Sequence, residues 1–189
     1  MISAILLAAG QSKRMEGENK LTKKINNYSL INHSVKNILN SSIDEVVIVL
    51  GHQSVIIEKL IEKNEKIKFV LNKNFKDGIS SSIKIGLNAL SKETDAFFIC
   101  LGDMPLISEN IYNKLIKFKN DKEIIVPTYK GCQGNPILFS KSMIKEIMTI
   151  KGDNGAKKIL KLNRNRSLYL ETYDENITKD FNTKDNFNY

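Results

Sequence analysis

Short, unbroken apolar runs recur along the chain, and they constrain its fold more than any other feature. The runs lack the alternation of half-exposed strands, which indicates strands buried on both faces of a parallel sheet. They lie at Ile2–Leu7, Glu45–Leu50, Ile67–Leu71, Ala96–Leu101 and Ile124–Pro127. Segments with apolar residues at helical spacing separate them, at residues 30–39, 54–64, 80–90 and 108–118. The alternation predicts an α/β fold, a single-domain Rossmann-like three-layer α/β/α sandwich with a mostly parallel central sheet.

The pattern changes after the fifth run. A loop with two glycines leads to a short strand at Ile137–Phe139, and helical pieces are expected at Lys141–Met148 and Asn154–Leu162. The serines at positions 80–82 are expected to cap the helix that they open. No linker, internal repeat or low-complexity block divides the chain, so we expect one domain.

The charge balance is compatible with an anionic ligand. The chain has 29 Lys and Arg against 21 Asp and Glu, a net charge of +8. The lysines are spread over the whole length and do not interleave with aromatic residues. We therefore expect no nucleic-acid partner, because a small anionic ligand explains the charge equally well.

The sequence predicts a cytoplasmic protein without a membrane partner. No apolar run approaches the roughly 20 residues of a membrane span, and the N-terminus lacks the basic start of a secretory signal. The two cysteines, Cys100 and Cys132, have no metal-ligand spacing. Cys100 ends an apolar strand and should be buried and inert, as expected in a reducing compartment.

The residues that follow the strands should share one edge of the sheet, where α/β folds bind their ligands. They are Gly10, Gly51, Asn72, Gly102 with Asp103, and Thr128. In the first turn, small residues followed by Arg14 and Lys20 could form a phosphate cradle, although solvated cations after a strand are the more common case. Asp103 could hold Mg²⁺ or could simply stabilise a turn before Pro105.

Two further loops have alternative interpretations. Gly78 and the three serines after it could face an anion or a nucleoside at the start of a helix, but a simple cap explains them as well. The Gly-Asn-Pro loop at residues 134–136 could admit a ligand or form a tight turn. The segment 152–160, GDNGAKKIL, looks first like an Asx turn into a helix.

Taken together, five motifs resemble one family. The stretches LAAGQSKRM…NKL, GISSSIKIGL, LGDMPLI, GNPILFS and GDNGAKKIL stand in the order found in molybdenum cofactor cytidylyltransferases, which belong to the nucleotidyltransferases that resemble the molybdenum cofactor guanylyltransferase. The resemblance implies a single nucleotidyltransferase domain over residues 1–189. Its nucleotide-binding half would span about residues 1–105, its acceptor-binding half about 106–180, and a polar tail about 181–189.

The resemblance also implies roles for individual residues. The backbone of Leu7, Ala8, Ala9 and Gly10 would hold the nucleotide, and Gly78 and Ser82 would lie by the base and ribose. Arg14, Lys20 and Asp103 would be catalytic, the two cations on the triphosphate and the carboxylate on Mg²⁺. Asn182 would offer the metal a second oxygen, and Asn135 would contact the acceptor.

The sequence departs from the family pattern at three positions. Asn182 stands where the family has a second acid, Glu16 stands where it has glycine, and Asn135 stands where many cytidylyltransferases have histidine. The Ala-Ala-Gly turn favours CTP, because guanylyl-transferring members usually show Ala-Gly-Gly.

The implied reaction is a Mg²⁺-dependent transfer of CMP from CTP to the terminal phosphate of a molybdopterin-type acceptor, with release of pyrophosphate. Three alternatives stay open. The enzyme could use GTP or a sugar-phosphate acceptor, or the protein could be a non-catalytic carrier of the cofactor for a molybdenum hydroxylase. A nucleic-acid-binding module is the most distant reading.

Overall fold

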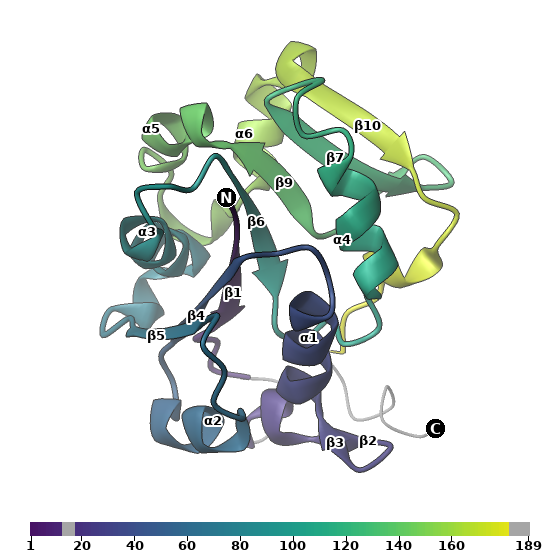
Figure 1. Cartoon of the computed structure of the whole chain (residues 1–189). Coiled ribbons are helices and arrows are strands. Elements are labelled where there is room, and N and C mark those ends of the chain that lie inside the picture. The colour runs from purple at the N-terminus through teal and green to yellow at the C-terminus, as the bar shows by residue number, and fades with distance from the viewer. Residues whose placement is uncertain (13–17, 182–189) are drawn as a thin grey trace.

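The computed structural model describes residues 1–12 and 18–181 (Figure 1). Its main sheet has eight strands. In chain order they are β1 (Ile2–Ala8), β4 (Glu45–Leu50), β5 (Ile67–Leu71), β6 (Ala96–Leu101), β7 (Ile124–Tyr129), β8 (Cys132–Gln133), β9 (Ile137–Ser140) and β10 (Ser167–Glu171). In space the order is β10-β7-β9-β6-β1-β4-β5, and the short β8 pairs with β7.

Strand β1 lies inside the sheet and pairs in parallel with β4 on one side and β6 on the other. The chain runs outward from β1 through β4 to β5 and then returns to form β6, so the direction of winding reverses between β1 and β6. Open α/β sheets bind ligands at such a switch point, beyond the carboxyl ends of the strands. Strand β9 is antiparallel to both of its neighbours, β6 and β7, while β10 is parallel to β7. The sheet is therefore mostly parallel, as predicted.

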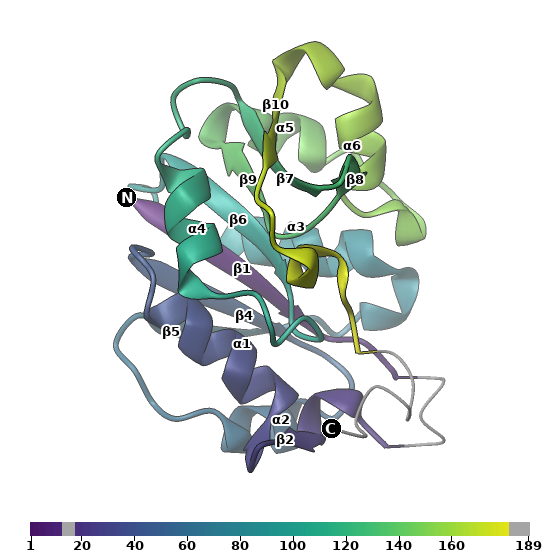
Figure 2. The same ribbon diagram turned by 90° about the vertical axis from the view of Figure 1, so that its right-hand side faces the viewer.

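Helices cover both faces of the sheet (Figure 2). Helices α1 (Leu30–Leu39), α2 (Ser54–Leu60) and α4 (Glu109–Ile116) pack on one face, and α3 (Ile79–Ala89), α5 (Ile144–Ile147) and α6 (Lys157–Leu162) pack on the other. Side chains of β1 alternate between the two cores, with Leu6 toward α1 and Ile5 toward α3. Each is 0 % exposed, and such burial contributes roughly 1.5–3 kcal/mol per side chain. The three-layer α/β/α prediction is confirmed.

Short elements join these layers. They are the hairpin β2 (Lys24–Ile25) with β3 (Tyr28–Ser29) and the 3₁₀ turns η2 (Lys20–Thr22), η3 (Phe75–Asp77), η4 (Lys141–Met143), η5 (Gly152–Asn154), η6 (Arg164–Arg166) and η7 (Glu175–Thr178). None of the helices in the described ranges is long and apolar enough to cross a membrane.

Two local predictions about helices were wrong. The helix expected over residues 54–64 ends at Leu60, because the chain turns to extended backbone at Ile61. The serines at positions 80–82 do not cap α3. Gly78 takes the capping position with a φ of 96°, and the serines fall inside the first turns of the helix.

The prediction for Cys100 is confirmed. The side chain is 1 % exposed and lies beside Tyr112. Burial raises the pKa of the Cys100 thiol to about 12, so the thiolate is disfavoured at neutral pH. Cys132 in β8 is exposed.

Candidate active site

The loops after four parallel strands meet at one edge of the sheet, as the sequence predicted. The loop after β6 is hydrogen-bonded to β1 through Gly102 N and Leu7 O, 3.1 Å apart. The loop after β4 contacts the turn after β1 through His52 N and Ala9 O, 3.3 Å apart, and Asn72 N after β5 donates to Leu50 O at 2.8 Å. These bonds fix the loop backbones relative to one another, which suits a preformed binding site.

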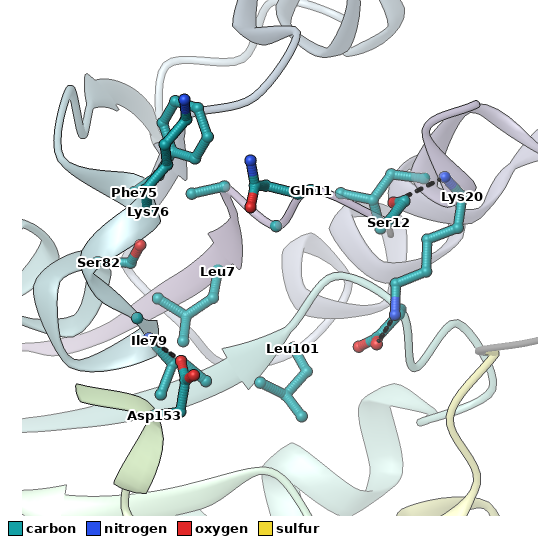
Figure 3. A pocket seen from close by; sticks show the side chains of 15 residues that line it. Leu7, Gln11, Ser12, Lys20, Phe75, Lys76, Ile79, Ser82, Leu101 and Asp153 are labelled. Atoms are coloured by element: carbon teal, nitrogen blue, oxygen red, sulfur yellow. Dashed lines mark hydrogen bonds and ion pairs between the residues drawn. The ribbon is translucent and has the colours of Figure 1, made fainter. Parts of the chain in front are cut away.

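A cavity of about 380 Å³ opens where β1 and β6 end (Figure 3). Seven of the residues implicated by sequence line it: Leu7, Ala9, Gly10, Lys20, Gly78, Ser82 and Asp103. Ala8 does not line it, since its side chain is 1 % exposed and points into the core on the other face of the sheet. Gln11, Ser12, Phe75 and Lys76 complete much of the rim.

Lys20 and Asp103 form an ion pair at one end of this cavity. The distance from Lys20 Nζ to Asp103 Oδ2 is 2.5 Å, and each side chain is 17 % exposed. The backbone of Lys20 is held by Ser12, whose hydroxyl oxygen accepts a hydrogen bond from Lys20 N at 3.0 Å. Asn19, 2 % exposed, stabilises the same turn by accepting from Leu21 N at 3.1 Å. The turn that follows β1 therefore holds the cation in place, and the cation pairs with a carboxylate from the loop after β6.

The carboxylate of Asp103 suits Mg²⁺. The ion needs only one or two protein carboxylates when phosphate oxygens and water supply its other ligands. A half-buried carboxylate at the mouth of a nucleotide-sized cavity meets that requirement. In the described part of the chain, no cluster of three or more His, Cys, Asp or Glu side chains forms a protein-only metal site.

Ser82 is oriented by Asn72, which is 2 % exposed. The amide nitrogen of Asn72 donates to Ser82 Oγ at 3.0 Å and to Ser81 Oγ at 2.8 Å. The Ser82 oxygen thus accepts from the protein, so its own proton can be donated to a carbonyl oxygen of a ligand.

Asp153 lies at the start of α3, although it comes from the distant turn η5. Its Oδ1 accepts a hydrogen bond from Ile79 N at 3.2 Å. The two segments touch so closely that a Cβ on Gly78 would lie 2.6 Å from this oxygen. Asp153 therefore supplies the cap of α3 that the sequence assigned to serines.

A second cavity, of about 360 Å³, adjoins the first and shares Ile79, Leu101 and Asp153 with it. Gln133 lines it from β8, Asn135 from the loop before β9, and Thr178 and Asp180 from the segment after β10.

That segment forms a wall anchored at two points. Ile177 O accepts from Asn135 N at 2.8 Å, and Phe181 N donates to Asp103 O at 3.0 Å. Ile177 is 0 % exposed and packs against Gly134, where a Cβ would lie 2.5 Å from its Cδ1 atom. The glycine of the Gly-Asn-Pro motif thus makes room for the wall of the second cavity.

Residues 4–168 match the family model described as the MobA-like NTP transferase domain. The chain belongs to the MobA-like NTP transferases. This confirms the resemblance drawn from the five motifs, and it makes the protein a member of a nucleotidyltransferase family.

Two relatives and two solved structures illustrate the similarity. The chain is 26 % identical to the molybdenum cofactor cytidylyltransferase of Escherichia coli, over 98 % of this chain and 93 % of that protein. It is 30 % identical to a probable molybdenum cofactor guanylyltransferase of Natranaerobius thermophilus, over 96 % and 89 %. Its fold matches Rv0371c from Mycobacterium tuberculosis with a TM-score of 0.83 at 21 % identity, over 98 % and 94 % of the two chains. Rv0371c has also been solved in complex with manganese, and that structure matches with a TM-score of 0.75 at 20 % identity, over 90 % and 89 %.

The structure brings together most of the residues that the sequence singled out in this MobA-like domain. Their roles stay predictions. Arg14, Asn182 and Glu16 lie outside the described residues, so the predictions made for them are not placed. Sequence reasoning missed the orienting role of Asn72 and the position of Asp153. The GDNGAKKIL motif contains Asp153, but its pattern indicates only a local turn and gives no sign of the contact with α3.

Proposed function

We propose that the protein is a Mg²⁺-dependent cytidylyltransferase that transfers CMP from CTP to the terminal phosphate of a molybdopterin-type acceptor. One observation carries the proposal: the Lys20–Asp103 pair lies at one end of a cavity that adjoins a second cavity through Ile79, Leu101 and Asp153. Such a site can hold a nucleotide and a second anion side by side. Bringing two anions together requires charge neutralisation and positioning, and it requires no covalent protein nucleophile.

The nucleotide would occupy the first cavity, on the backbone of Leu7 to Gly10. Ser82 would donate its free proton to a base carbonyl, since Asn72 already donates to its oxygen. The methyl group of Ala9 supports a pyrimidine, because it takes space that the Ala-Gly-Gly turn of guanylyl-transferring relatives leaves open.

Lys20 and Arg14 would bind the triphosphate and stabilise the departing pyrophosphate. The ammonium of Lys20 now neutralises Asp103, and it can pass to the phosphates when the carboxylate takes the metal. Bound Mg²⁺ supplies Lewis-acid polarisation of the phosphate oxygens. Asp103 would hold it, with Asn182 as a second oxygen donor.

The acceptor would occupy the second cavity, beside Asn135. The two cavities share the lining residues Ile79, Leu101 and Asp153, so we propose that the nucleotide-binding and acceptor-binding halves act as one domain. A molybdenum hydroxylase that receives the product is the protein partner that best fits an acceptor of this kind.

The test is pyrophosphate release by the purified protein, measured with CTP and with GTP in the presence of Mg²⁺ and molybdenum cofactor. We expect release with CTP. Release with GTP alone would replace the nucleotide assignment, a result that the guanylyltransferase relative makes worth testing. Pyrophosphate release only in the presence of a sugar phosphate would show that the acceptor is a sugar phosphate and not a molybdopterin-type compound.

Variants separate an enzyme from a carrier. Lys20→Met should lower turnover about 10²-fold or more, since it removes a cation from the developing charge. Lys122→Met is the matched control, because Lys122 donates to Asn165 O at a distance from both cavities. A protein that binds cofactor tightly without turnover, and is unaffected by Lys20→Met, would be a carrier.

A further inference from the structure

Asp153 stands at the junction of the two cavities and has no role in the chemistry described so far. It lines both of them. Its Oδ1 accepts from Ile79 N, whereas no hydrogen bond to its Oδ2 is found within residues 1–12 and 18–181. The side chain therefore presents a carboxylate oxygen to whatever occupies the cavity, and the bond to Ile79 fixes its position.

The first cavity has two chemically different ends (Figure 3). Lys20 lies at one end, where its ammonium meets Asp103. Ser82 and Ile79 lie toward the other end, and Asp153 lies next to them. A triphosphate belongs at the Lys20 end, where a metal held by Asp103 and the freed ammonium would neutralise it, whereas the Asp153 carboxylate would repel it at the other end. Asp153 therefore faces the uncharged part of a nucleotide.

The uncharged part nearest to the phosphates is the ribose. A sugar held between Ser82 and Lys20 lies over the apolar side chains of Leu7 and Leu101, and Asp153 borders the same region. Carboxylates accept hydrogen bonds from ribose hydroxyls in other nucleotide-binding folds, because an ionised acceptor gives a strong bond to a neutral hydroxyl donor.

We infer that Asp153 accepts a hydrogen bond from a ribose hydroxyl of the nucleotide and makes the site selective for ribonucleotides over deoxyribonucleotides. The inference rests on the proposed function, since it takes the first cavity to be the nucleotide site. It adds that the GDNGAKKIL turn contacts the ribose through Asp153. The close packing of this turn against Gly78 positions the carboxylate for that contact.

The test is equilibrium binding of CTP, 2′-deoxy-CTP and 3′-deoxy-CTP by calorimetry, without acceptor. If the protein prefers GTP, the guanosine series is used. A hydrogen bond to a charged acceptor predicts that the wild type binds the ribonucleotide at least about tenfold more tightly than one of the two deoxy analogues. In Asp153→Ala that ratio should fall to about one, because the acceptor atom is gone.

Asp153→Asn is a second variant that should keep the fold, since its amide oxygen can still accept a hydrogen bond from Ile79 N. Its neutral side chain should reduce the ratio to about threefold. Asp121→Asn is the control for loss of charge, because this exposed carboxylate lines neither cavity, and it should leave the ratio unchanged.

The outcomes separate the inference from the proposed function. If Asp153 only caps α3, its variants will weaken all three nucleotides equally and leave the ratio intact, which overturns the inference alone. A wild type that does not discriminate between ribose and deoxyribose overturns it as well. Failure to bind either CTP or GTP overturns the proposed function, and the inference falls with it.

Discussion

Replacing Gly86 by alanine should destabilise the protein although the residue lies inside a helix. Gly86 faces β1, and a Cβ there would lie 2.3 Å from Ile5 Cγ2 and 3.2 Å from Val49 Cγ2. Carbon atoms pack at about 3.5–4.0 Å, so α3 or Ile5 would have to move by more than about 1 Å. Ile5 is 0 % exposed, so any movement displaces other core side chains.

The expected cost follows from two opposing terms. Overpacking of a filled core typically costs about 1–3 kcal/mol. Alanine in place of glycine stabilises a helix by about 1 kcal/mol, which offsets part of that cost. We expect a net loss of about 1–2 kcal/mol in the free energy of unfolding. Nucleotide binding should weaken too, since Ser82 lies one helical turn away on the same face of α3.

Chemical denaturation monitored by circular dichroism measures the first effect, and calorimetry with CTP measures the second. Gly10→Ala is the matched control. Gly10 lines the first cavity, a Cβ added to it would have no neighbouring atom within 4 Å, and it is not among the glycines with positive φ. It should keep its stability within about 0.5 kcal/mol but lose nucleotide affinity. A Gly86→Ala protein as stable as the wild type would refute the packing argument.

Three further predictions concern other parts of the molecule. Asp103→Asn should lower the rate of pyrophosphate release at least about 10²-fold while nucleotide binding persists, and an unchanged rate would exclude the metal role. Hydrogen bonds from Arg166 and Ser142 lower the pKa of Glu123 from 4.5 to about 2, so its stabilisation is present above about pH 4.5 and is lost as the pH falls toward 2. Because the pair is about one-third exposed, Glu123→Gln should cost at most about 1 kcal/mol in urea unfolding at neutral pH, and this difference should shrink toward zero as the pH falls through about 2. A maleimide should label one thiol of the folded protein, Cys132, and both thiols after unfolding, whereas rapid labelling of Cys100 would contradict its burial.

The fold could be predicted because its signal is local. Strands β1, β4 and β6 are mostly apolar along their length, whereas the edge strand β5 contains Lys68 and is partly exposed. Each covering helix carries its own apolar stripe. The parallel arrangement then placed Gly10, Asn72 and Asp103 at one edge without further information. The antiparallel direction of β9 was not foreseen, because the three-residue apolar run Ile137–Phe139 carries no mark of its direction.

The site was only partly predictable, because its contacts join distant residues. Lys20 and Asp103 are 83 positions apart, and both were identified without any sign that they touch. Asp153 and Ile79 are 74 positions apart, so the sequence gives no sign that one caps the helix of the other. The stretch around Asp153 was interpreted as a local turn, and the helix that begins at Ile79 was expected to be capped by serines. Such pairs are set by the packing of η5 against α3, which no single stretch of sequence encodes.

The lining residues that the two cavities share have a consequence for turnover. On the proposed function each substrate occupies one cavity, whereas the joined product occupies both at once. Tethering makes the second contact intramolecular, so the product should bind more tightly than either substrate alone. Ile79, Leu101 and Asp153 line both cavities, so both halves of the product would contact the same three residues. Departure of the product would then limit the rate, and a receiving protein that takes it directly from the site would accelerate the enzyme.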